Sequence, residues 1–239
     1  MFFGGNVAWG IAPSSIDYAG LPYNNLKEKA GFVLKAGFDI VYHFNNKIAL
    51  QSGVSGFLKT YRVAYPKDFT QIRVNLLQAS SRTFNISIPL EVKYLIPISK
   101  KKKSFFISTL GMFIDFYPEN QKWQEGGSAF DPLTNDVASY YADYGIKSIF
   151  STSPKVSIGI EKITKKNNIN SFSINFIWGL KQVMNGNFKY WDGYWTFPFT
   201  GNPNNPVLLP PIAPNEEYEY FSKGTMFYFE FKKLFKISK

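Results

Sequence analysis

The chain has 239 residues, no cysteine and a single histidine, His43. The lack of cysteine excludes disulfides, thiolate metal sites, a cysteine nucleophile and a lipidated N-terminal cysteine. With one histidine, zinc sites and Ser-His-Asp catalysis are limited to whatever His43 can reach. We therefore expect no catalytic residue, no metal site and no cofactor.

Arginine is scarce as well. Of the 27 basic residues only Arg62, Arg73 and Arg82 are arginines, although the net charge is +10. A nucleic-acid-binding protein would carry Arg-rich or mixed basic and aromatic patches on one element. Here the lysines gather at particular turns instead, so we expect no nucleic-acid partner.

Long apolar runs are also missing. No segment approaches the ~18 consecutive apolar residues of a transmembrane helix. Yet 45% of the residues are hydrophobic and 18% are aromatic, with a mean hydropathy of −0.17. The apolar residues must therefore be interleaved with polar ones, and the period of the interleaving indicates the fold.

That period is two. In residues 30–44 the even positions are all apolar or aromatic, whereas the odd positions are mostly small, polar or charged. Alternation of this kind predicts a β-strand, because successive side chains of a strand point to opposite faces. It recurs at residues 3–11, 48–59, 82–97, 105–116, 154–161, 171–181 and 225–232, which gives eight predicted strands.

The connections between these strands alternate in length. Three are short (45–47, 99–104 and 165–168) and four are long (13–28, 62–79, 118–149 and 185–222). An even strand count with short turns on one side and long loops on the other is typical of outer-membrane barrels. We predict an all-β chain, with residues 1–239 forming a single domain. Its fold is an eight-stranded antiparallel transmembrane up-and-down β-barrel with short periplasmic turns and long extracellular loops.

A soluble barrel also alternates, with its apolar face inward. Side-chain size favours the membrane type, because the apolar face is crowded with large residues that suit a narrow eight-stranded lumen poorly. This interpretation places the protein in a bacterial outer membrane. It also implies a signal peptide in the precursor, and residues 1–5 lack the basic and apolar regions of one.

The inward face of the predicted strands carries both signs of charge. We expect these residues to form a lumen charge network: Lys35, Asp39, Glu91, Lys93, Asp115, Lys155, Glu161, Lys181, Glu230 and Lys232. Unpaired buried charge is costly, so the opposite charges should pair and close the lumen. A narrow polar conduit is the alternative. A closed lumen gives a sugar no access to these carboxylates, which argues against a glycosidase. His43 is predicted to face inward at the periplasmic end, a position poorly placed for the base of a lipid hydrolase.

Two further surfaces are candidates for contact. A basic periplasmic rim comprises Lys100, Lys101, Lys102, Lys103, Lys165 and Lys166. It is either a solvated rim or a contact for anionic headgroups or an acidic partner. An aromatic loop comprises Tyr190, Trp191, Tyr194, Trp195, Phe197 and Phe199. It could bind protein or glycan, or belong to an aromatic girdle at the membrane interface.

The segment Ser87-Ile88-Pro89-Leu90-Glu91-Val92-Lys93-Tyr94 resembles the "IPL-x-x-K-Y" strand of an outer-membrane β-barrel family common in Bacteroidota, a broad group that includes PorT-like barrels. Residues 105–116, with Gly111 in the middle, resemble the next strand of that family. The resemblance implies a non-enzymatic membrane barrel, and some relatives are accessory parts of secretion or assembly machines.

We therefore expect a structural or accessory subunit of a larger envelope complex for secretion, transport or assembly. The expected partners are outer-membrane lipids, lipopolysaccharide and an envelope protein. A small pore is the alternative function, followed by an enzyme that modifies lipid or glycan.

Overall fold

The computed structural model describes residues 1–12, 27–65, 77–98, 103–118, 121–131, 136–192 and 216–237. Thirteen β-strands account for most of these residues. Among the same residues, no helix is long and apolar enough to cross a membrane.

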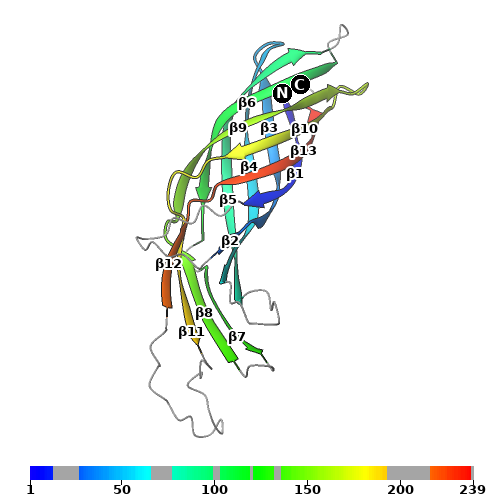
Figure 1. The fold of residues 1–239 in the computed structure, drawn as a ribbon. Helices are drawn as coiled ribbons and strands as arrows, with labels where there is room; N and C mark the ends of the chain where they lie inside the picture. The colour runs from blue at the N-terminus through cyan, green and yellow to red at the C-terminus, as the bar shows by residue number, and fades with distance from the viewer. Residues whose placement is uncertain are drawn as a thin grey trace, which may run out of the picture.

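Eight of the strands close into an antiparallel barrel, in which each strand pairs with its neighbours and β13 pairs back to β1 (Figure 1). In order around the barrel they are β1 (Phe2–Ala12), β3 (Gly31–His43), β4 (Ile48–Tyr65), β5 (Leu77–Pro97), β6 (Ser104–Phe116), β9 (Phe150–Ile163), β10 (Ile169–Ile177) and β13 (Met226–Lys236). The predicted all-β, eight-stranded antiparallel barrel is confirmed.

The outer wall of the barrel is apolar. Large hydrophobic side chains from all eight strands are exposed on it, among them Val7, Phe38, Leu110 and Ile160. An apolar outward band around a polar lumen is the arrangement of a transmembrane barrel. The large side chains thus face outward, as their size predicted.

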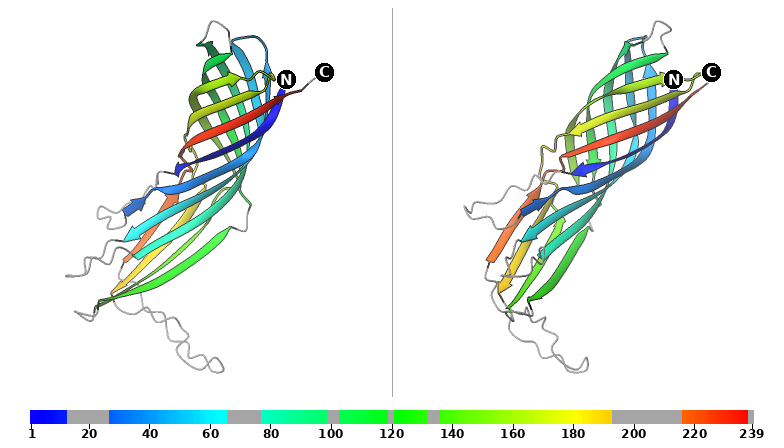
Figure 2. Two further views of the ribbon diagram at one scale, coloured as in Figure 1. Left: turned by 90° about the vertical axis from the view of Figure 1, so that its right-hand side faces the viewer. Right: turned by 45° about the vertical axis from the view of Figure 1, so that its right-hand side comes forward.

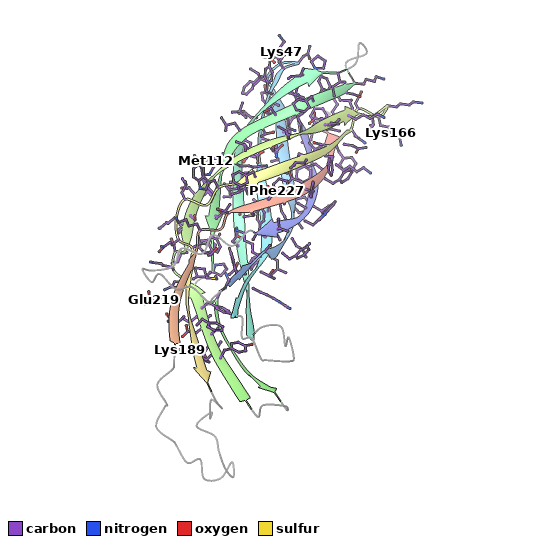
Figure 3. The ribbon with its side chains drawn as sticks, in the orientation of Figure 1. Lys47, Met112, Lys166, Lys189, Glu219 and Phe227 are labelled. Carbon is purple, nitrogen blue, oxygen red and sulfur yellow. The ribbon has the colours of Figure 1, made fainter. Side chains whose placement is uncertain are left out.

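Two short turns and both chain ends lie at one end of the barrel, here called the short-turn end (Figure 1). In the first turn, the backbone N–H groups of Lys47 and Ile48 both donate to Oδ1 of Asn45, at 2.8 Å each. In the second, Asn167 adopts a left-handed φ of 58°, a conformation that asparagine tolerates better than most residues. Figure 3 shows Lys47 and Lys166 projecting at this end.

A second sheet continues from the opposite, long-loop end (Figures 1 and 2). This distal sheet has the strand order β12-β11-β8-β7. Its strands are β7 (Lys122–Asp131), β8 (Asp136–Ile146), β11 (Met184–Asp192) and β12 (Glu216–Ser222). A short strand, β2 (Lys27–Lys29), pairs with the far part of β4.

The distal sheet corrects the expectation that residues 118–149 and 185–222 form loops. The signal was present in the sequence, because Tyr140, Ala142 and Tyr144 alternate with more polar residues and are all buried. Met184 and Phe188 follow the same period on the paired strand β11 and are also buried.

Candidate functional site

The lumen at mid-height is filled by ion pairs in two clusters. In the first, Lys232 lies 3.0 Å from Asp39 and 3.0 Å from Glu230, and Lys35 also pairs with Glu230. These residues come from β3 and β13, which are separated by β1. The cluster therefore spans β1, whose inward Asn6 is buried beneath it.

The second cluster joins β5 to β9 across β6. Lys93 lies 2.8 Å from Glu161, and Lys155 lies 2.7 Å from Glu91. β6 contributes Gly111 at this level, where an added Cβ would stand 2.8 Å from Cγ of Glu91. The missing side chain therefore leaves the space through which Glu91 reaches Lys155.

Charge is balanced over the described part of the lumen. The buried charged side chains are five lysines and five carboxylates: Lys35, Lys59, Lys93, Lys155, Lys232, Asp39, Glu91, Asp115, Glu161 and Glu230. Asp115 accepts hydrogen bonds from Asn85 Nδ2 at 3.0 Å and from the Ser87 hydroxyl. Because burying a charge is tolerable only when it is paired and hydrogen-bonded, this balance explains how so many can lie inside.

The observed charge network differs from the predicted one at two residues, Lys181 and Lys59. Lys181 is exposed and follows the end of β10 at Ile177, so its predicted place in the lumen is wrong. The outward alternation continues through Trp178 and Leu180 after the strand has ended, and this misled the prediction. Lys59 was not in the predicted network, but it is fully buried and donates to the Tyr117 hydroxyl at 3.1 Å.

Apolar layers lie on both sides of the charged layer. The layer toward the short-turn end comprises Val41, Ala49, Leu95, Phe105, Ile107, Ile169 and Leu234. The layer toward the long-loop end comprises Ala8, Ala12, Val33, Phe57, Phe113, Ile177, Met226 and Tyr228. The expectation of a mostly small and polar inner face thus does not hold in these two layers.

The aromatic residues of the layer toward the long-loop end are in contact with the charges at mid-height. Phe57 packs edge-on against Phe113 and Tyr228, with ring centroids 5.6 Å and 5.9 Å apart. The ammonium of Lys35 lies 5.7 Å from the centroids of Phe57 and Phe113 and 5.8 Å from that of Tyr228. Cation–π attraction within ~6 Å therefore adds to the ion pair of Lys35 with Glu230.

Glu91 and His43, the titratable groups considered for catalysis, both lie against other side chains of the barrel. Glu91 is held by Lys155 and by Gln51, whose Nε2 donates to it at 3.4 Å. His43 is half-buried at the end of β3, with the Phe2 ring 5.3 Å away. Within the described ranges, no group of three or more acidic or histidine side chains could hold a metal ion.

The two predicted contact surfaces are only partly described. Lys103, Lys165 and Lys166 are exposed at the short-turn end. The rim residues Lys100, Lys101 and Lys102 lie outside the described residues, as do Tyr194, Trp195, Phe197 and Phe199 of the aromatic loop. The backbone of Tyr190 and Trp191 belongs to β11, so these two stand on a strand and not on a loop.

The distal sheet has one aromatic face and one polar face. On the first, the rings of Tyr140 and Phe188 stack with centroids 5.5 Å apart. The other face carries a groove of about 300 Å³, lined in part by Lys122, Gln124 and Asn185. On this sheet, partial burial and the nearby Asp143 raise the pKa of Tyr141 above its usual value.

No protein-family model matches the chain, and no curated protein sequence matches it. Among solved structures it is similar to the outer membrane protein OprG from Pseudomonas aeruginosa, with 12% identity over 99% of this chain and 95% of that chain and a TM-score of 0.49. It is also similar to the COG4313 outer membrane channel from Pseudomonas putida F1, with 10% identity over 98% and 95% and a TM-score of 0.25. Neither likeness extends to function at these identities.

Proposed function

We propose that this protein is a non-enzymatic outer-membrane barrel that does not conduct and serves as a structural or accessory subunit of a larger envelope complex. Its place in the outer membrane is supported by the apolar outer wall, because in water such a surface would drive aggregation. The resemblance of residues 87–94 to a Bacteroidota barrel family stays a prediction in line with this proposal.

The filled lumen is the observation that carries the functional proposal. An ion crossing the barrel would have to pass two apolar layers and a charged layer in which lysines are already paired with carboxylates. A barrel of eight strands has just enough interior for its own side chains. If the lumen binds nothing, contact with other molecules must occur on the outer wall or on the distal sheet.

The distal sheet is the surface best suited to a protein partner. It continues the barrel beyond the long-loop end, and its β12-β11-β8-β7 order leaves β12 and β7 at the edges of the described sheet. Sheet edges carry unpaired backbone groups that can accept an added strand. We expect the partner in the envelope complex to bind there.

Two measurements test this function. Gentle detergent extraction of the tagged protein from native membranes, with mass spectrometry of the eluate, should recover a stoichiometric envelope protein. Recovery of a lone barrel under all mild detergents would contradict the subunit proposal. In planar bilayers the purified barrel should give no steady single-channel current.

A small pore is the second candidate, and the charged middle layer of the lumen is the feature that favours it. Steady conductance that changes when Glu91 or Lys155 is substituted would establish the pore in place of the closed barrel. An enzyme acting on lipid or glycan is the third candidate. Its best candidates are His43 and Glu91, so hydrolysis of a membrane substrate that is lost in His43→Ala or Glu91→Gln would contradict the non-enzymatic proposal.

A further inference from the structure

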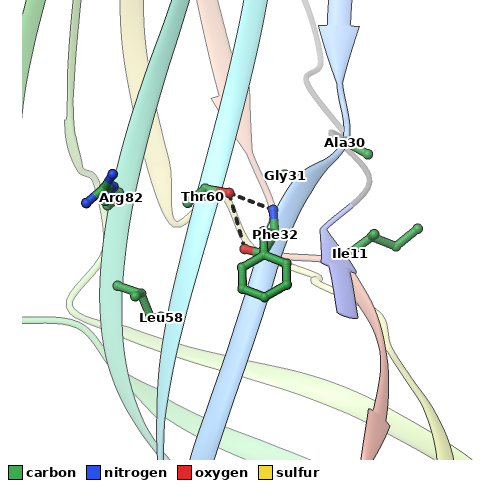
Figure 4. Close-up of a pocket in the computed structure, with 7 residues that line it drawn as sticks. All are labelled: Ile11, Ala30, Gly31, Phe32, Leu58, Thr60 and Arg82. Atoms are coloured by element: carbon green, nitrogen blue, oxygen red, sulfur yellow. Dashed lines mark hydrogen bonds between the residues drawn. The ribbon is translucent and has the colours of Figure 1, made fainter. Parts of the chain in front are cut away.

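The outer wall near the long-loop end is hollowed along the side formed by β1, β3, β4 and β5. One hollow of about 520 Å³, nearer the long-loop end, is lined by Ile11, Phe32, Leu58, Thr60 and Arg82, among others (Figure 4). A second hollow of about 450 Å³, nearer mid-height, is lined in part by Trp9, Ala36, Gly56, Leu58 and Phe84. Leu58 lines both, so the two hollows adjoin at that side chain, and together they are called the furrow here.

Small residues form the floor of the furrow at its mid-height end. Ala36 and Gly56 are paired in register on β3 and β4, between the larger Trp9 on β1 and Phe84 on β5. A Cβ added to Gly56 would stand 3.1 Å from the Phe84 ring. The furrow is therefore an apolar trough whose sides are aromatic.

Arg82 lies at the end of the furrow nearest the long-loop end of the barrel. It is the residue on β5 where the exposed apolar series that starts at Phe84 gives way to charge, and its side chain is exposed. In the described part of the chain, no carboxylate lies within ion-pair distance of it. The Thr60 hydroxyl beside it is already engaged, accepting from Phe32 N–H at 2.6 Å and donating to the Phe32 carbonyl at 3.3 Å. Among the side chains that the structure describes, Arg82 is thus a free cation at the end of the furrow.

Two further basic residues stand on the neighbouring strands. Thr60 pairs with Arg82, and Arg62, two positions further along β4, pairs with Lys29 on β2. Arg62 and Arg82 are two of the three arginines in the whole chain. Arginine suits phosphate better than lysine does, because its planar fork binds two oxygens at once.

The length of the furrow fits one leaflet. From Arg82 to Ile86, the register partner of Gly56, is four residues of β5. At ~3.4 Å per residue this is roughly 14 Å along the strand, and a strand tilted by ~40° covers roughly 10 Å of bilayer depth in that length, less than half of the ~30 Å hydrocarbon thickness. An acyl chain whose headgroup lies at Arg82 would therefore run along the trough within one leaflet.

We propose that Arg82 and the furrow below it bind lipopolysaccharide, with a lipid A phosphate on the guanidinium and one acyl chain over Gly56 and Ala36. The long-loop end of an outer-membrane barrel faces the cell exterior, where the lipid of that leaflet is an acylated and phosphorylated sugar. The site rests on the outer-membrane location proposed above, but not on the closed lumen or the protein partner.

The test uses the full chain refolded in detergent without lipopolysaccharide and titrated with lipid A, with dephosphorylated lipid A and with phosphatidylglycerol. Arg82→Gln should weaken lipid A binding by roughly tenfold or more, the loss expected when one charge-assisted contact is removed. The same variant should bind dephosphorylated lipid A as the unchanged protein does. Arg82→Lys should recover part of the loss.

Filling the trough tests the apolar half of the site. Gly56→Leu should weaken binding of both forms of lipid A alike. Gly5→Leu is the matched control, because Gly5 also lies exposed on the outer wall but near the short-turn end, where an added Cβ meets nothing closer than 3.9 Å. It should leave binding unchanged, and circular dichroism should show all variants folded.

Two results would overturn the proposal. One is equal affinity of Arg82→Gln and the unchanged protein for lipid A. The other is phosphatidylglycerol binding as tight as lipid A binding, which would assign the site to a phospholipid. Neither result bears on bilayer conductance or on co-purification of a partner, so failure of the lipid site and failure of the proposed function are distinguishable.

Discussion

Successive residues of β5 belong to two environments. Ile88, Leu90 and Val92 point outward and are 44%, 46% and 50% exposed, whereas Glu91 and Lys93 on the opposite face are 4% and 1% exposed. In the proposed outer-membrane location lipid surrounds the outer wall, so an apolar side chain there needs no particular neighbour. In the lumen each polar group needs a specific partner, because an unpaired buried charge costs several kcal/mol. The two faces should therefore respond in opposite ways to the same kind of substitution.

Breaking a lumen ion pair should have the largest effect. Lys93→Met leaves Glu161 buried without its partner at 2.8 Å, and should lower the free energy of unfolding by ~3–5 kcal/mol. Urea titration of the barrel in lipid vesicles measures it. The double variant Lys93→Met/Glu161→Leu removes both charges and should cost far less. A single variant as stable as the unchanged protein would contradict the paired lumen.

Placing a charge on the outer wall should have the next largest effect. Leu90→Lys, midway along the exposed apolar series of β5, should lower the free energy of unfolding by ~2–4 kcal/mol. Ile98→Lys, at the short-turn end of the same series, should cost only ~0–1 kcal/mol. The same urea titration applies. Equal costs at the two positions would mean that the outer wall does not face lipid.

An aromatic-to-aliphatic change should separate the two faces more finely. Phe57→Leu in the lumen loses its edge-on contacts with Phe113 and Tyr228, and should cost about 1–2 kcal/mol. Phe176→Leu on the outer wall should cost close to nothing, because lipid refills the space. Comparison of the two unfolding midpoints is the measurement, and similar losses would show that packing on the outer wall is as specific as in the lumen.

The smallest effect is expected outside the barrel. Tyr140→Leu removes the stacking on Phe188 in the distal sheet, which is worth roughly 1 kcal/mol. Because local units can open separately from the whole, cleavage of this sheet by a protease added outside vesicles should become faster, while the urea midpoint of the barrel stays the same. A shifted barrel midpoint would show that sheet and barrel unfold together.

The sequence predicted the barrel well where alternation is long and uninterrupted. β3 and β5 each have one face apolar over eleven residues or more, and a period of two is enough to assign such strands. It failed at Lys181, where alternation continues beyond the strand, and in the distal sheet, where it is shorter and broken by residues such as Gly126 and Gly186. Pairing of β8 with β11 is also a non-local event that no local pattern records.

The candidate sites divide in the same way. Nine of the ten predicted lumen charges are buried inside, because inward position follows from alternation. Their partners do not follow from it. The furrow at Arg82 had no signal in the sequence, because Ala36 and Gly56 meet only through the pairing of β3 with β4.

By itself, then, the sequence determined which face of each strand meets lipid and which meets the lumen, because that property is carried by neighbouring residues along one chain. The tertiary structure decided which charge meets which and where the apolar layers close the lumen. The contact between Lys35 and Glu230 joins residues 195 positions apart. Only the stagger of strands around a closed barrel sets such a pair at one height, and that stagger is a property of all eight strands together.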